Sequence, residues 1–134
     1  IRDRVVLGGY CRDARLVEAY AAMDVLAYPF PGTDKSCRTV REAMAAGVPV
    51  VASRVGYLPT LVRDDLTGRV VGAEAGEFAD AIGGLLADPA SLAAMSERAR
   101  EDARARFSTR GQAEACLAFY SRVDALCSRP HSGG

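Results

Sequence analysis

Residues 28–52 constrain this chain more than any other stretch, because they combine a strand end, a polar loop, a helix and a second strand. The apolar run that ends at Tyr28 is stopped by Pro29, and turn residues follow. The next segment has helical periodicity up to Gly47, a residue type that commonly ends helices. The apolar run 48–52 then predicts another buried strand.

Ser36 and Thr39 are both candidate N-caps of this helix, since a hydroxyl there can accept a hydrogen bond from a first-turn amide. A helix start leaves unpaired backbone N–H groups, and the helix dipole also favours negative charge there. We therefore expect the amides of residues 36–39 to receive a phosphate. Three apolar side chains share one helical face and are expected to face the core: Val40, Ala43 and Met44.

Charged side chains surround this helix start. Lys35 and Arg38 add positive charge, and Asp34 and Glu42 add two hydrogen-bond acceptors. If the helix begins near Ser36, Glu42 lies roughly 9 Å further along the axis at about 1.5 Å per residue. This separation suits a ligand with hydroxyl groups at both ends and phosphate between them, such as a nucleotide sugar.

Short apolar runs alternate with helical segments over much of the chain. They predict strands at residues 5–7, around Val25, at 48–52 and at 68–71. This alternation argues for an α/β fold, a Rossmann-like parallel sheet with flanking helices. In such folds ligands bind beyond the carboxyl ends of the strands. Three loops are expected on that edge: residues 8–12, 29–35 and 53–57.

The remaining segments are expected to be helical. Asp13 should cap a helix, and residues 56–62 predict one or two further turns that include Pro59. Beyond residue 71 the chain turns helical and ends with a helix over residues 109–126. Residues 1–127 would form one domain, and residues 128–134 a disordered tail. Apolar stripes expected to face the core are Leu16, Tyr20 and Met23; Phe78, Ile82 and Leu85; Leu92, Met95, Ala99 and Ala103; and Ala113, Cys116 or Leu117, Tyr120 and Val123.

The composition excludes several classes of function. The 134 residues carry 17 basic and 17 acidic side chains, so no electrostatic footprint for nucleic acid or an anionic membrane stands out. The four cysteines lack metal-site spacing, which predicts free thiols and no metal site. No apolar run approaches the roughly 18 residues of a membrane span. Because Ile1 is already next to the first expected strand, we expect the natural N-terminus to lie upstream.

The run that begins at Glu42 and ends at Val50 reads Glu-Ala-Met-Ala-Ala-Gly-Val-Pro-Val. It resembles Glu-Ala-Met-Ala-x-Gly-x-Pro-Val, the second half of the motif of glycosyltransferase family 4, which comprises retaining enzymes with the two-domain GT-B fold. The first Glu of the family motif falls at Asp34, and the family's Gly-Phe-Gly-Leu is replaced by Lys35-Ser36-Cys37-Arg38. The resemblance continues over residues 52–56, 65–71 and 106–120. The chain is thus similar to a fragment, the C-terminal donor-binding domain.

This resemblance implies roles for individual residues. Glu42 is similar to the family Glu that accepts hydrogen bonds from the ribose hydroxyls. Asp34 takes the position that contacts the donor sugar and is the candidate catalytic residue. Lys35 and Arg38 would reinforce the grip on the diphosphate, and residues 8–10 would line the base pocket. The expected donor-binding residues are Gly8, Gly9, Tyr10, Asp34, Lys35, Ser36, Cys37, Arg38, Thr39 and Glu42.

By the same resemblance, the full-length enzyme transfers a hexose from a UDP- or GDP-hexose to an acceptor hydroxyl, with retention and without a metal or other cofactor. It would be cytoplasmic, or peripheral at the membrane. The family places an acceptor-binding domain and two more strands of this sheet ahead of the present residues, so we expect the chain alone to be inactive. Those two strands belong between the first and second expected strands. We therefore also expect self-association, through open sheet edges or exchange of the first strand.

Other interpretations stay open at this point. Glu42 is alternatively a solvated carboxylate paired with Arg38, and Asp34 a simple helix cap. The charges of Lys35 and Arg38 are alternatively solvated, and the glycines at 8 and 9 only form a turn. Cys37 is a poor candidate nucleophile, since no His lies near it in the sequence. Rival functions are a non-catalytic nucleotide-sugar-binding or interaction module, a nucleotide-sugar epimerase and a receiver-like signalling domain.

Overall fold

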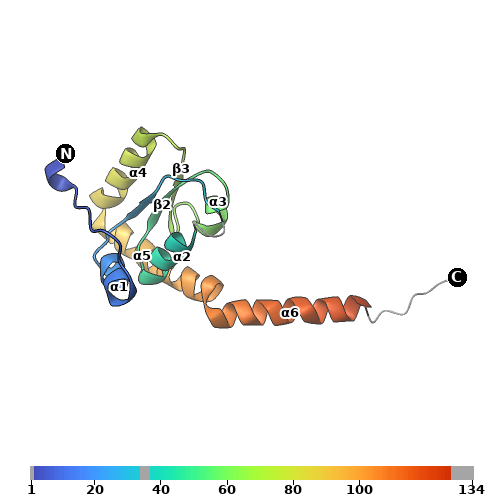
Figure 1. The fold of residues 1–134 in the computed structure, drawn as a ribbon. Coiled ribbons are helices and arrows are strands. Elements are labelled where there is room, and N and C mark those ends of the chain that lie inside the picture. Colours follow the sequence, from blue (N-terminus) through green and yellow to red (C-terminus); the bar gives the residue numbers. More distant parts are fainter. Residues whose placement is uncertain (1, 34–36, 128–134) are drawn as a thin grey trace.

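The computed structural model describes residues 2–33 and 37–127. Its centre is a parallel sheet of the strands β1 (Leu26–Tyr28), β2 (Val50–Ser53) and β3 (Gly68–Val71), in the order β1-β2-β3 (Figure 1). All four residues of β2 are buried, as expected for a central strand covered on both faces. The predicted Rossmann-like sheet with flanking helices is confirmed, and β3 has the predicted bounds.

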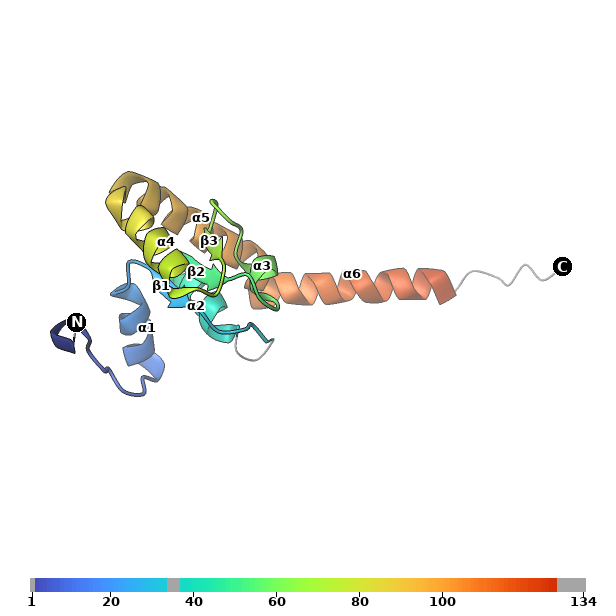
Figure 2. The ribbon, with the colours of Figure 1, turned by 90° about the horizontal axis from the view of Figure 1, so that it is seen from above.

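Helices cover both faces of this sheet. On one face, Val50 and Ala52 pack in a core cluster with residues of α2 and α5, and on the other face Val51 packs against α4. Successive residues of a strand point to opposite faces, which is why β2 serves both clusters. Figure 2 shows α4 on one side of the sheet and α1 and α2 on the other. The helices are η1 (Arg2–Arg4), α1 (Asp13–Ala21), α2 (Arg38–Ala46), α3 (Leu58–Leu61), α4 (Ala75–Ala87), α5 (Pro89–Phe107) and α6 (Thr109–Cys127).

Helix α2 begins and ends for local reasons. Gly47 ends it in the left-handed conformation, with φ 81° and ψ 28°, as predicted. The predicted N-caps are wrong for the described residues: Cys37 takes this position without a side-chain cap, and Thr39 lies inside the helix. The Cys37 side chain is fully buried and packs in the core cluster instead of capping the helix. The predicted core face of Val40, Ala43 and Met44 is confirmed.

The strand expected at residues 5–7 is wrong. Val5, Val6 and Leu7 form no strand and are 59%, 90% and 92% exposed. A strand needs a hydrogen-bonding neighbour, and β1, the edge of the described sheet on this side, pairs with β2 alone. The βαβ unit that residues 5–7 would have formed with α1 and β1 is therefore absent from the described residues. Self-association through this edge stays a prediction.

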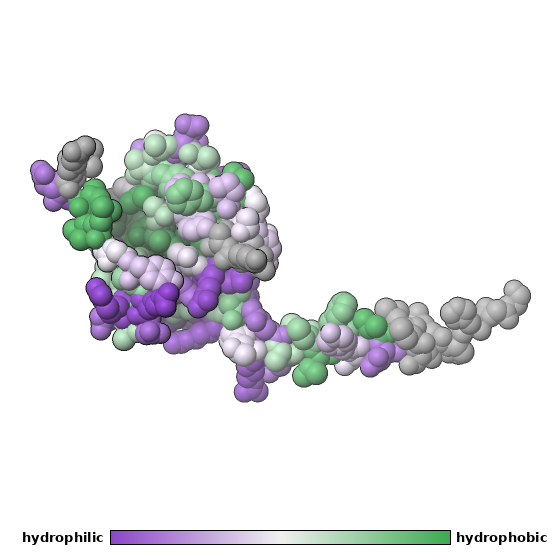
Figure 3. Space-filling model, viewed as in Figure 1, coloured by the Kyte–Doolittle hydropathy of each residue, from purple (hydrophilic) through white to green (hydrophobic). Residues whose placement is uncertain are grey.

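The core-facing stripe expected on α6 is also wrong. The helix itself is confirmed, but it extends away from the sheet, and Leu117, Phe119 and Tyr120 are 67%, 55% and 65% exposed (Figure 1). Figure 3 accordingly shows hydrophobic residues on the surface of this helix. Helical spacing indicates that a face is apolar, but it does not identify what covers that face. The expected tail, residues 128–134, lies outside the described residues.

The other helical predictions are largely correct. On α4 and α5 the buried positions include Phe78, Leu85 and Met95, as the stripes predicted. On α1 only Tyr20 is buried, while Met23 beyond its end is 38% exposed. Asp13 does not cap α1; it is the first residue of the helix, after Arg12. Within the described ranges, no helix is both long enough and apolar enough to cross a membrane.

Candidate functional site

Two of the predicted loops meet beyond the carboxyl ends of β1 and β2. The Tyr57 amide donates a hydrogen bond to the Gly32 carbonyl at 3.1 Å, and the Ser53 hydroxyl donates to the Phe30 carbonyl at 3.2 Å. Gly56 has φ 66°, and a Cβ atom there would lie 2.5 Å from the Gly32 carbonyl oxygen. This close approach requires glycine. It holds the loop that leads into α2 in place.

A cavity of about 420 Å³ lies between α1, the segment before it and the first turns of α2. It brings together four of the predicted site residues, Tyr10, Arg38, Thr39 and Glu42. Five further residues, none of them among the expected donor-binding residues, also line it: Cys11, Arg12, Asp13, Leu16 and Tyr20.

Glu42 is one of the two carboxylates that line this cavity, the other being Asp13, and both oxygens of Glu42 have a described donor. Arg38 Nε lies 2.7 Å from Glu42 Oε1, and the Tyr20 hydroxyl donates to Glu42 Oε2 at 3.1 Å. The Glu42 side chain is 31% exposed, so it remains accessible from the cavity. The ion pair with Arg38, one of the two interpretations of Glu42, is present. This ion pair does not block access to the cavity, because the Arg38 side chain is 80% exposed.

Among the lining residues that the sequence did not indicate, Tyr20 is the one that contacts Glu42, and its place on an apolar stripe had suggested only a core role. Its ring is buried among core residues while its hydroxyl reaches Glu42. Burial, and after it the hydrogen bond to Glu42, raises the pKa of Tyr20 from 10.0 to about 12. A buried tyrosine hydroxyl usually needs a partner, and this rule is the signal that could have found the contact.

The raised pKa of Tyr20 predicts a pH effect on stability. Because the folded protein holds the phenol proton more tightly than the unfolded chain, the contribution of Tyr20 is fully present below about pH 10 and is lost toward about pH 12. We expect the difference in unfolding free energy between the wild type and Tyr20→Phe to shrink over that range. Urea unfolding of both proteins at about pH 8 and about pH 11 measures the difference. A difference that grows with pH would contradict the assignment.

Other predicted site residues are placed differently. Gly8 and Gly9 are exposed and are not among the residues that line the cavity, and the Arg12 guanidinium lies 4.9 Å from the centre of the Tyr10 ring. Cys37 is fully buried, which argues against a role as nucleophile, and its amide donates to the Thr33 carbonyl at 2.9 Å. Asp34, Lys35 and Ser36 lie outside the described residues, so their roles stay predictions. Within the described part of the chain, no cluster of metal-ligating side chains is found.

The parallel sheet, with a polar cavity at the start of the helix that follows β1, defines a Rossmann-like α/β domain of the ligand-binding type. The chain belongs to the family of glycosyl transferases group 1, whose model matches residues 1–88. This match confirms the resemblance seen in the sequence.

Relatives and solved structures agree with this assignment. The chain is 41% identical to a D-inositol 3-phosphate glycosyltransferase of Mycolicibacterium vanbaalenii, over 98% of this chain and 28% of that protein. It resembles sucrose-phosphate synthase from Thermosynechococcus elongatus with a TM-score of 0.77 and 33% identity, over 92% of this chain and 31% of that one. An Anabaena protein, HepE, solved in complex with UDP-glucose, matches with a TM-score of 0.65 and 29% identity, over 79% of this chain and 30% of that one. The chain thus spans about three tenths of the length of these proteins.

Proposed function

We propose that this chain is the donor-binding part of a retaining glycosyltransferase that transfers a hexose from a UDP- or GDP-hexose to an acceptor hydroxyl. The observation that carries this proposal is the Glu42 carboxylate, which faces the cavity at the start of α2 in a chain of the glycosyl transferases group 1 family. Its role is to accept hydrogen bonds from the ribose hydroxyls. Of the two candidate donors, the UDP-hexose is supported by the similar Anabaena protein that was solved with UDP-glucose.

The diphosphate is proposed to bind at the N-terminus of α2, about one turn from Glu42. First-turn amides of a helix and its dipole favour an anion there, and Cys37 supplies no side-chain cap that would compete. The Cys37 amide is already engaged by the Thr33 carbonyl, so we assign this role chiefly to its neighbours within residues 36–39. Arg38 and Lys35 add positive charge. These groups would stabilise the leaving diphosphate electrostatically, without a protein nucleophile.

Asp34 is proposed to contact the hydroxyls of the donor sugar, because it takes the place of the first Glu of the family motif. The acceptor site would belong to the other part of a full-length enzyme. On this view the chain alone binds the donor but does not transfer the sugar.

Glu42→Ala tests the proposed function most directly. We expect the wild-type chain to bind UDP or GDP and the corresponding nucleotide hexoses in calorimetric titration, and we expect Glu42→Ala to bind them about ten to a hundred times more weakly. The loss of hydrogen bonds to a charged group accounts for this size of effect. Circular dichroism checks that each variant is folded.

Glu97→Ala is the matched control, because Glu97 is also a helical glutamate paired with an arginine, Arg100 at 3.4 Å, but it does not line the cavity. It should bind as the wild type does. Equal affinities of Glu42→Ala and the wild type would refute the role of Glu42. A folded wild type that binds none of these nucleotides would refute the donor site itself.

A further inference from the structure

One contact in the cavity joins two helices that are distant in sequence. Tyr20 of α1 donates a hydrogen bond to Glu42 of α2 at 3.1 Å, across 22 residues. The same hydroxyl lies 3.5 Å from the Thr39 carbonyl, at the limit for a hydrogen bond. A phenol carries a single proton to donate, and the shorter contact to a charged acceptor is the stronger one. The carboxylate of Glu42 is therefore the main partner of Tyr20.

The two side chains that donate to Glu42 differ in exposure and therefore in how tightly packing restricts them. Arg38 is 80% exposed, and an exposed ion pair between neighbouring turns of one helix contributes little. Tyr20 is only 7% exposed, and its ring packs in the core cluster beside residues such as Val40 and Met44. A side chain that is locked by packing can hold its neighbour in one place. Tyr20 is thus the firmly packed donor that can fix the position of the Glu42 carboxylate.

The geometry leaves the carboxylate free acceptor positions. A carboxylate offers about four lone-pair positions, and Tyr20 and Arg38 use one on each oxygen of Glu42. About two positions remain, one per oxygen, and Glu42 is accessible from the cavity. Two acceptors on one carboxylate match a pair of neighbouring hydroxyl groups, such as the 2′- and 3′-hydroxyls of a ribose.

We propose that Tyr20 is a positioning residue of the donor site, which holds Glu42 so that the carboxylate accepts both ribose hydroxyls. This inference rests on the proposed function, since it assigns Glu42 to the ribose. Tyr20 does not touch the ligand in this proposal; it acts through Glu42 and so favours ribose over deoxyribose nucleotides.

Tyr20→Phe tests this role, because it removes the hydroxyl and keeps the packed ring. We expect the affinity for UDP or GDP, measured by calorimetry, to fall about fivefold, the effect of one hydrogen bond. The affinities for 2′,3′-dideoxy-UDP and 2′,3′-dideoxy-GDP should be the same for the variant and the wild type, because these ligands offer Glu42 no ribose hydroxyls. A merely structural role of Tyr20 would weaken both kinds of ligand alike.

Tyr120→Phe is the matched control, since Tyr120 lies exposed on α6. Loss of its hydroxyl should change neither the affinity for UDP and GDP nor the affinity for their dideoxy analogues. Equal binding of UDP and GDP by Tyr20→Phe and the wild type would overturn the positioning role and leave the proposed function standing. Equal losses for the ribose and dideoxyribose ligands would also overturn it. A folded wild type that binds neither UDP nor GDP would overturn the donor site together with this inference.

Discussion

Replacing Met44 with alanine is expected to lower the free energy of unfolding by about 2–5 kcal/mol, the range for emptying a well-packed core position. Met44 is fully buried and is among the largest fully buried side chains of the described residues. It lies on the face of α2 that packs against the sheet, in the same core cluster as Val50 and Leu58. Its removal leaves a cavity where the helix that carries Glu42 meets the sheet.

The measurement is urea unfolding followed by circular dichroism, with Met23→Ala as the matched control. Met23 carries the same side chain, but it is 38% exposed and lies beyond the end of α1. Truncation of Met23 should lower the free energy of unfolding by well under half as much as truncation of Met44, because little apolar surface is lost from the core. If the two variants lost equal stability, the packing of α2 on the sheet described here would be wrong.

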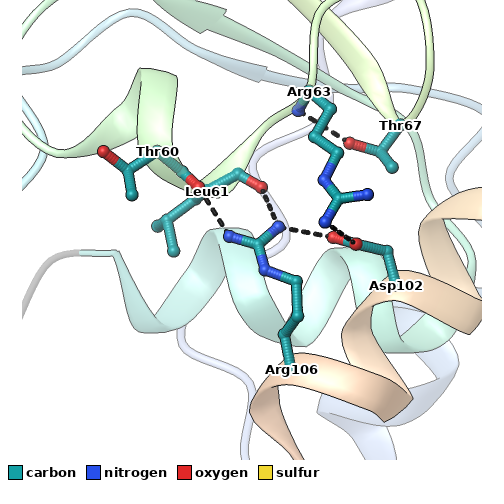
Figure 4. A network of polar contacts seen from close by, with 6 residues as sticks. All are labelled: Thr60, Leu61, Arg63, Thr67, Asp102 and Arg106. Carbon is teal, nitrogen blue, oxygen red and sulfur yellow. Dashed lines mark hydrogen bonds and ion pairs between the residues drawn. The ribbon is translucent and has the colours of Figure 1, made fainter.

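Replacing Asp102 with alanine is expected to lower the unfolding free energy by about 2–3 kcal/mol, since charged hydrogen bonds are lost in a shielded place. Figure 4 shows the Asp102 carboxylate between two guanidinium groups. Its oxygens lie 3.2 Å from Arg63 Nη2 and 2.6 Å from Arg106 Nη1, and its side chain is 9% exposed. Arg106 also donates to the Leu61 and Thr60 carbonyls. Asp102 thus helps to tie α5 to the end of α3 and to the loop that precedes β3.

Glu114→Ala is the control for this second variant. Glu114 also accepts from an arginine four positions away in its helix, Arg110 at 2.9 Å, but the two side chains are 64% and 90% exposed. Its loss should change the unfolding free energy by less than about 1 kcal/mol, as for most exposed ion pairs. Equal effects of the two substitutions in urea unfolding would contradict the structural role of Asp102. Added salt should weaken the Glu114 pair more than the shielded Asp102 pair.

Predictions with a local physical cause were largely correct, apart from the helix N-caps expected at Thr39 and Asp13. Gly47 ends α2 because only glycine adopts the left-handed conformation readily. Strand β3 begins and ends at the predicted residues. The α4 and α5 stripes follow from helical periodicity, and their buried positions match it closely. Glu42, Arg38 and Thr39, which the motif and the start of the helix indicated, line the same cavity, and their roles in binding a donor stay predictions.

Predictions that depended on a distant partner were less reliable. Residues 5–7 are as apolar as a strand, yet no described strand pairs with them. The apolar face of α6 resembles that of a core helix, yet it is exposed. Tyr20 fits the core stripe of α1, and only the approach of α1 to α2 places its hydroxyl on Glu42.

The sequence by itself determined most of the helices and strands, including the helix that carries Glu42, and it suggested the kind of ligand that the charges and amides at the start of this helix suit. The tertiary structure alone decided which apolar runs are buried, which segments pair, and which buried side chain holds the carboxylate of the site. The reason is physical. Helix ends, turns and periodicity depend on residues within a few positions of one another, whereas strand pairing, burial and hydrogen bonds such as that from Tyr20 to Glu42 depend on segments that only folding brings together.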